Sequence, residues 1–283
     1  MKIAAWQLGG RRSKLIFCLA LFIITCVVPS NALQQRSDQE IVRQARQSYY
    51  SLKSQGLTEL RCIVQPDWDS MNKVLHADIV QTVQVLPILK GTHFTVLLGP
   101  DGASTILPEP DIAPPSEEIA RRFRQSVGFM HGMLTRFLQT WSNFMFSPIL
   151  PEPDSVYHLE NLGKKYGLSF DKKGARVAVI LNHELGIEEV KGWPTLDVTL
   201  HPHWSPSSNG LILTGYKTSY KLAKNQPAAE ESVKVKYEQV EGLSLPSIVD
   251  MELPISVNST GFPESMFIPP MRLVFLNYQV KKR

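Results

Sequence analysis

The closest pair of histidines in the chain is His201-Pro202-His203, with one residue between the two imidazoles. On an extended strand, residues i and i+2 point to the same face, so these imidazoles could bind one metal ion. A protein zinc site takes three or four ligands, and no third ligand is identifiable beside this pair. His183-Glu184 likewise lacks the second histidine of a metalloprotease helix. We therefore interpret these histidines as structural or solvated, and we expect no metal and no cofactor.

The remaining polar residues also fail to form a recognisable reaction centre. The chain contains no Gly-x-Ser-x-Gly elbow, no phosphate-binding glycine loop and no dinucleotide fingerprint. Its neighbouring acids are typical of a charged surface or of a helix start, and they are Asp67/Asp69, Glu117/Glu118 and Glu188/Glu189. An enzyme is therefore disfavoured, although a secreted hydrolase is kept as the least favoured alternative.

An unusually apolar segment offers a different chemistry, the burial of an acyl chain. Ser116 is placed to cap a helix that extends to Phe146, before a group of prolines. A helix that is apolar on most sides is either enclosed in a core or lines a cavity, and we keep both interpretations. Gly128 and Gly132, four residues apart, would let another backbone or a ligand approach this helix closely. The candidate cavity-lining residues of the helix are Phe129, Met130, Met133, Phe137, Trp141, Phe144 and Met145.

The stretch from Ser232 to Leu253 supplies the other candidate lining residues. Apolar and charged residues alternate with a period of two, which indicates a strand with one buried and one solvated face. Val233, Val235 and Tyr237 form the first face, which we expect to point toward the helices. The charged face, expected in solvent, consists of Lys234, Lys236 and Glu238.

A turn at Glu241-Gly242 predicts that this strand pairs with the next as a hairpin. Pro246 has no N–H to donate, so the return strand is expected to begin after it, at Ser247, or to have an edge or bulge there. The pattern therefore predicts a late strand pair in an antiparallel sheet.

The rest of the chain predicts further helices and strands. We expect helices from Ser37 through Leu52, with Gly56 as a C-terminal cap, and from Trp68 to Leu86. The expected strands are Leu60–Val64, Thr92–Leu98, Ala103–Leu107, Val156–Leu159, Tyr166–Phe170, Arg176–Leu181, Gly186–Val190, Thr195–His201, Leu211–Leu222, Val233–Val240, Ser247–Leu253 and Met271–Val280. Short connections predict a meander. The fold class is therefore α+β: a curved antiparallel sheet, open as a half-barrel, with about three helices packed on its concave face.

The beginning of the chain predicts export. Arg11, Arg12 and Lys14 precede an apolar run, Leu15–Val28, that is too short to span a bilayer of about 30 Å. A small-x-Ala ending follows, so we expect a secretory signal peptide, residues 1–32, with cleavage after Ala32. Residues 33–283 are then a single domain.

Removal of this leader changes the charge of the protein. Residues 1–32 contain four basic and no acidic residues, so the formal charge of +4 falls to zero. A neutral mature chain has no charge surplus to attract nucleic acid. Two of the three cysteines leave with the leader, and Cys62, left without an internal partner, is expected to pack as a small buried hydrophobe.

The order of these elements resembles the bacterial lipoprotein-sorting carriers, the LolA/LolB-like half-barrel. The resemblance lies in a capped first helix, helices within an antiparallel meander, the late pair KYEQVEGLSLPSIVDMEL and the closing strand Leu273–Val280. It implies an open half-barrel whose concave face, covered by helices, takes acyl chains. The functional basic residue of that family cannot be placed on any position of this chain.

Together, these observations predict a non-catalytic protein that binds a lipid or a lipoprotein. We expect it in the bacterial periplasm or at the outer membrane, with an acyl-chain lipid or lipoprotein as its partner. The alternative is an envelope scaffold whose apolar helix is core or meets a membrane-associated protein.

Overall fold

The computed structural model describes residues 37–69, 79–110, 113–172, 174–192, 198–220, 229–252 and 271–283. Residues Asp38–Arg283 form one compact unit. The expected signal peptide, residues 1–32, lies outside the described residues, so export and cleavage after Ala32 stay predictions. None of the helices in the described ranges has the length and hydropathy of a membrane span.

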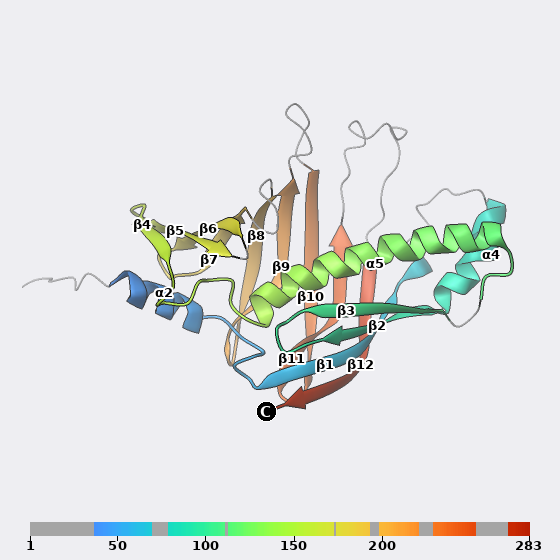
Figure 1. Ribbon diagram of the computed structural model, residues 1–283, viewed down its shortest axis with the longest axis horizontal. Coiled ribbons are helices and arrows are strands. Elements are labelled where there is room, and N and C mark those ends of the chain that lie inside the picture. Colours follow the sequence, from blue (N-terminus) through green and yellow to red (C-terminus); the bar gives the residue numbers. More distant parts are fainter. Residues whose placement is uncertain are drawn as a thin grey trace, which may run out of the picture. The chain divides into compact units, whose positions relative to one another are not determined.

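Three helices and one antiparallel sheet of twelve strands make up the described residues (Figure 1). The helices are α2 (Asp38–Gln47), α4 (Ile79–Lys90) and α5 (Glu117–Met145). The strands are β1 (Leu57–Pro66), β2 (Thr92–Leu98), β3 (Ser104–Pro110), β4 (Tyr157–Asn161), β5 (Lys165–Lys172), β6 (Ala175–Asn182), β7 (Ile187–Lys191), β8 (Val198–Ser207), β9 (Gly210–Tyr220), β10 (Ala229–Val240), β11 (Leu243–Glu252) and β12 (Met271–Lys282).

The sheet is a meander that is extended at one end by the first strands of the chain. Strands β4 to β12 are neighbours in the sheet in the same order as in the sequence. β12 then pairs with β1, which brings Leu57 opposite Lys282, and β2 and β3 follow beyond β1. β3 and β4 end this order, so among the described residues the sheet does not close. The predicted α+β class with an open, curved sheet is confirmed.

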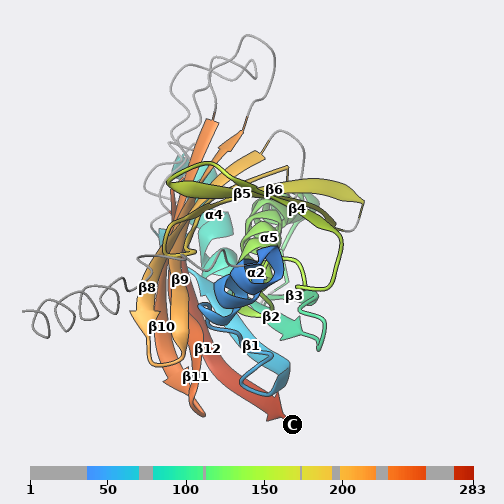
Figure 2. The same ribbon diagram turned by 90° about the vertical axis from the view of Figure 1, so that its left-hand side faces the viewer.

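Helix α5 lies inside the curve of the sheet, where Figure 2 shows strands around it. Its N-terminus is fixed by Ser116, whose side chain accepts a hydrogen bond from the backbone N–H of Ile119. Phe146 is the C-cap, so both predicted ends of this helix are confirmed. Because α5 carries apolar residues beyond one narrow stripe, it can bury side chains against several strands at once.

The β10–β11 hairpin forms on the predicted turn. Glu241 and Gly242 have φ angles of 51° and 77°, the left-handed pair that a two-residue hairpin turn requires. β11 begins at Leu243, so the start expected at Ser247 is wrong, but the bulge expected near Pro246 is present. The partner of Lys236 is Ile248 and that of Tyr237 is Pro246, which leaves Ser247 as the extra residue.

Two other predicted boundaries are wrong for physical reasons. α2 ends at Gln47, not Leu52, because the chain turns extended and the Tyr50 N–H donates to Leu211 O at the start of β9. α4 continues past Leu86 through Pro87 to Lys90, where only side chains from residue 84 onward are described. The first part of that predicted helix, residues 70–78, lies outside the described residues.

Candidate functional site

The residues predicted to line a cavity are mostly brought together between α5 and the sheet. Eight of the ten are buried, with exposed fractions of 5% or less: Met130, Met133, Phe137, Trp141, Phe144, Met145, Val233 and Val235. Tyr237 is half-buried on the same face of β10. Phe129 is 41% exposed and lies on the outer side of α5, so the structure does not bring it to the others.

A hydrogen-bonded chain joins α5 to two strands of the concave face. The indole nitrogen of Trp141 donates to the hydroxyl oxygen of Tyr237 at 3.1 Å, and that hydroxyl donates to Leu213 O at 2.5 Å. Burial raises the pKa of Tyr237, so its hydroxyl stays protonated and can act as donor and acceptor at once. The expected orientation of Val233, Val235 and Tyr237 toward the helices is therefore confirmed, and Lys234, Lys236 and Glu238 are exposed.

Aromatic side chains and methionine fill the space around this link. The ring of Phe137 lies 5.9 Å from that of Phe275 on β12, and the ring of Phe144 lies 5.6 Å from that of Trp204 on β8. The sulfur of Met145 accepts a hydrogen bond of 3.4 Å from the backbone N–H of Leu213. In this structure α5 therefore occupies the concave face with its own side chains, and an apolar ligand there has to displace some of them.

The same face contains a buried carboxylate that the sequence reasoning missed. Glu231 on β10 is 2% exposed, and its carboxylate accepts a hydrogen bond from the hydroxyl of Tyr220 on β9. Arg136 of α5 lies above it, with Nε 3.6 Å from Oε2 of Glu231. The Arg136 guanidinium also lies 5.6 Å from the centre of the Tyr220 ring, a cation–π contact. The period-two alternation that buries Val233 also places Glu231 inward, and this was the signal available.

Tyr216 on β9 completes this polar cluster. It is 1% exposed, and its hydroxyl lies near the side chain of Thr140 on α5. Burial, followed by the Glu231 charge, raises the pKa of Tyr216 and of Tyr220, so both phenols stay neutral. The cluster can accept and donate hydrogen bonds, and it gives an otherwise apolar interface a fixed polar point beneath α5.

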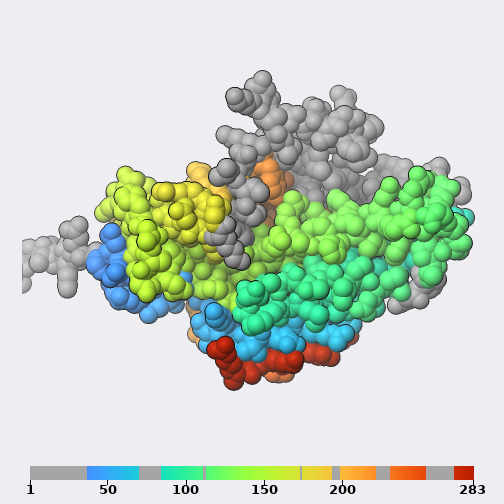
Figure 3. Space-filling model, in the orientation of Figure 1, coloured from blue at the N-terminus to red at the C-terminus, as the bar shows by residue number. Residues whose placement is uncertain are grey.

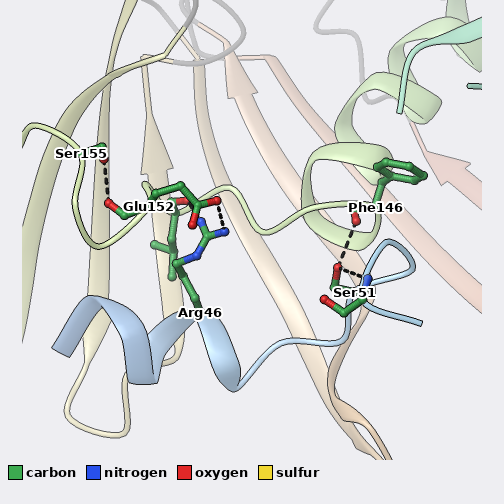
Figure 4. A network of polar contacts seen from close by, with 7 residues as sticks. Arg46, Ser51, Phe146, Glu152 and Ser155 are labelled. Carbon is green, nitrogen blue, oxygen red and sulfur yellow. Dashed lines mark hydrogen bonds and ion pairs between the residues drawn. The ribbon is translucent and has the colours of Figure 1, made fainter. Parts of the chain in front are cut away.

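The C-terminal end of α5 is fastened to the segment that follows α2. Figure 4 shows Ser51 donating to the carbonyl oxygen of Phe146, at 3.1 Å, and Arg46 reaching Glu152, at 2.5 Å. The backbone N–H of Leu52 also donates to Met145 O at 2.8 Å. The contacts of Ser51 and Leu52 satisfy carbonyl groups that a helix end otherwise leaves free, and they hold the last turn of α5 in place. The pair of Arg46, in α2, with Glu152 holds the chain that follows α5.

The histidine pair does not form a metal site in the structure. His201 and His203 are both exposed on one face of β8, in the middle of the strand and not at its end as expected. Nε2 of His201 lies 3.9 Å from Oε2 of Glu189. Among the residues described, no group of three or more metal-ligating side chains comes together.

Cys62 packs in the core as expected, with 1% of its surface exposed. Burial raises the pKa of its thiol to about 12, so the thiol is not a nucleophile at neutral pH.

No backbone of the described chain makes the close approach to α5 that Gly128 and Gly132 would allow. A methyl group added at Gly128 or Gly132 would meet no atom of the described chain within 4 Å. Both residues are exposed, because the sheet contacts the opposite side of the helix. Figure 3 shows the outer side of α5 as a band on the molecular surface beside β2 and β3.

No family model, no curated protein and no solved structure matches this chain. The likeness to the lipoprotein-sorting carriers therefore stays a prediction that rests on the order of the elements.

Proposed function

We propose that this protein is an exported, non-catalytic binding protein for an acyl-chain lipid or a lipoprotein in the bacterial cell envelope. One observation carries the proposal: the methionine- and aromatic-rich side of α5 lies against the concave face of a sheet that stays open. An apolar helix held between the two open ends of a sheet can be moved without breaking strand pairs. The periplasm or the outer membrane is the proposed location, which depends on the predicted signal peptide.

The energetics favour a long acyl chain as the ligand. Burial contributes about 0.8 kcal/mol per methylene, so a sixteen-carbon chain supplies about 12 kcal/mol. The loss of translational and rotational freedom on association opposes binding by roughly 4–15 kcal/mol. Because α5 already fills the concave face, the ligand has to replace protein contacts. Met130, Met133 and Met145 suit this exchange, since methionine is unbranched and adapts to irregular space.

Native mass spectrometry of the protein purified from its own host tests this function. The proposal predicts an added mass that extraction with organic solvent removes and that fragments as a lipid or an acylated peptide. After extraction, the refolded protein should bind cis-parinaric acid with a rise in fluorescence. A protein that carries no lipid and binds no fatty-acid probe would contradict the proposal.

A second candidate function is an envelope scaffold without a ligand. The scaffold function is favoured by the packing of Phe137, Trp141 and Phe144. Each is 1% exposed, which is typical of a close-packed protein core. It predicts that a membrane-associated protein, and no lipid, is purified together with this chain.

A further inference from the structure

A polar pocket of about 410 Å³ lies on the side of α5 that faces away from its apolar contacts. The last three turns of α5 form its floor. One wall is the β2–β3 turn with the start of β3, and the other contains Lys172 at the end of β5. These walls come from opposite halves of the sheet, so the curve of the sheet around α5 creates the pocket. Its volume is within the range of small-molecule sites.

The β2–β3 wall is held in place by its contact with the end of α5. Gly102 in the β2–β3 turn has φ of 79°, and a methyl group added there would lie 3.1 Å from the ring of Phe146. The turn thus rests directly on the C-cap residue of α5. The carbonyl of Phe146 in turn accepts hydrogen bonds from the Ser51 hydroxyl and from the backbone N–H of Lys53. A pocket built from fixed elements loses little entropy when it binds a ligand.

The pocket offers hydrogen-bond donors and acceptors that are not used in contacts between the described residues. Gln139 and Asn143 are one helical turn apart on the floor. Asn143 uses its amide nitrogen on Gln139 O, which leaves its amide oxygen to accept. Asp101 uses one carboxylate oxygen on the N–H of Ala103, which leaves the other, and Ser104 lines the same pocket. Such a mixture of amides, a carboxylate and hydroxyls suits a ligand with several hydroxyl groups, each of which both donates and accepts.

Electrostatics disfavour an anionic ligand. The pocket lies at the C-terminal end of α5, where the helix dipole is negative. Asp101 carries a negative charge on one wall, and Lys172 carries a positive charge on the other. A phosphate or a carboxylate would therefore gain little, whereas a neutral ligand meets no net charge.

We propose that this pocket is a binding site for a neutral, hydroxyl-rich ligand of the saccharide class, either free or as the sugar headgroup of a lipid. The site lies on the outer side of α5, so the proposal goes beyond acyl-chain binding and does not depend on it.

Saturation-transfer NMR and calorimetry with the full chain test the proposal. The probes are trehalose, maltotriose and triacetylchitotriose as free neutral sugars, dodecyl maltoside below its micelle concentration as a sugar-bearing lipid, and inorganic phosphate as an anion. The variants are Gln139→Ala and Asn143→Ala. Gln125→Ala, an exposed glutamine of α5 outside the pocket, is the matched control. Circular dichroism of each variant verifies that the fold is retained.

At least one sugar-bearing probe is expected to bind, with affinity lowered about five- to tenfold by Gln139→Ala or Asn143→Ala and unchanged by Gln125→Ala. Binding of maltotriose assigns the site to free saccharides, and binding of dodecyl maltoside alone, with the same loss in the two variants, assigns it to a lipid headgroup. The proposal is overturned if no sugar-bearing probe binds, if phosphate alone binds, or if the two pocket variants bind as well as the control.

Discussion

The indole nitrogen of Trp141 and the hydroxyl of Tyr237 are 3.1 Å apart, and they join the most apolar helix of the chain to the middle of its sheet. The two residues are 96 positions apart in the sequence. Their hydrogen bond, continued to Leu213 O, fixes which side of α5 faces β9 and β10. The buried carboxylate of Glu231, beneath Arg136, fixes the same helix farther along its length.

Replacing Tyr237 with Phe should destabilise the protein by about 1–3 kcal/mol, because it leaves the Trp141 N–H and the Leu213 carbonyl without a buried partner. Urea unfolding measures this change. Tyr157→Phe is the control, since its hydroxyl donates to Pro153 O near the surface, and it should cost less than about 1 kcal/mol. Equal losses in the two variants would show that the link to Trp141 contributes nothing of its own.

Replacing Glu231 with Ala should cost about 2–4 kcal/mol of unfolding free energy. The change removes the counter-charge of Arg136 and the acceptor of Tyr220. The cost is lower than is usual for a buried pair because the Arg136 side chain is 39% exposed and partly hydrated. Glu230→Ala, one residue away on the exposed face, should change stability by less than about 0.5 kcal/mol. A similar, small effect of both substitutions would contradict the role given to the buried carboxylate.

Replacing Gly132 with Ala should stabilise the protein by about 0.5–1 kcal/mol. The site is helical and open, so the methyl group meets no clash and the unfolded chain loses freedom. Gly102→Ala should have the opposite effect, a loss of about 1–2 kcal/mol, because φ is positive there and the Phe146 ring is in contact. Thermal unfolding of both variants measures the difference. A loss of stability in Gly132→Ala would mean that the outer side of α5 is covered.

The stability of the protein should fall in alkali partly through Cys62. Burial raises the pKa of the thiol from 9.0 to about 12 in the folded state. Between these values the unfolded chain loses its thiol proton and the folded chain keeps it, so unfolding becomes easier as the pH rises. From pH 8 to pH 10 this loss is about 1.4 kcal/mol.

Urea unfolding at pH 8 and pH 10 measures how far the free energy of unfolding falls between the two pH values. This fall should be about 1.4 kcal/mol smaller in Cys62→Ala than in the unchanged protein. Buried tyrosines ionise with the same sign in both proteins and cancel in the comparison. An equal fall in both would show that the thiol is accessible to base in the folded state.

Local signals predicted much of this fold because each acts within a few residues. Ser116 caps α5, the Glu241-Gly242 turn forces a two-residue hairpin, and the alternation after Ser232 determines which side of β10 is buried. These features depend on backbone geometry and on the burial of apolar groups, which neighbouring residues determine.

Long-range features could not be predicted in the same way. The pairing of β1 with β12 joins residues more than 200 positions apart, and no local pattern encodes it. Glu231 was missed because an acid is normally solvated, and only Arg136 and Tyr220, on other elements, make its burial acceptable. The polar pocket was missed because its walls meet only when the sheet curves around α5. The placement of Phe129 on the outer side likewise depends on how α5 is rotated against the sheet.

Quenching of Trp141 fluorescence by 9,10-dibromostearate tests the central claim most directly, that an acyl chain binds between α5 and the concave face. Bromine quenches an indole only in close contact, so we expect saturable quenching at micromolar fatty acid. The quenching should be reduced in Trp141→Phe, where Trp204, whose ring lies 5.6 Å from that of Phe144, supplies the remainder, and kept in Trp68→Phe, which removes a buried indole that donates to Thr92 O. No saturable quenching, or equal quenching in the two variants, would contradict acyl-chain binding at this site.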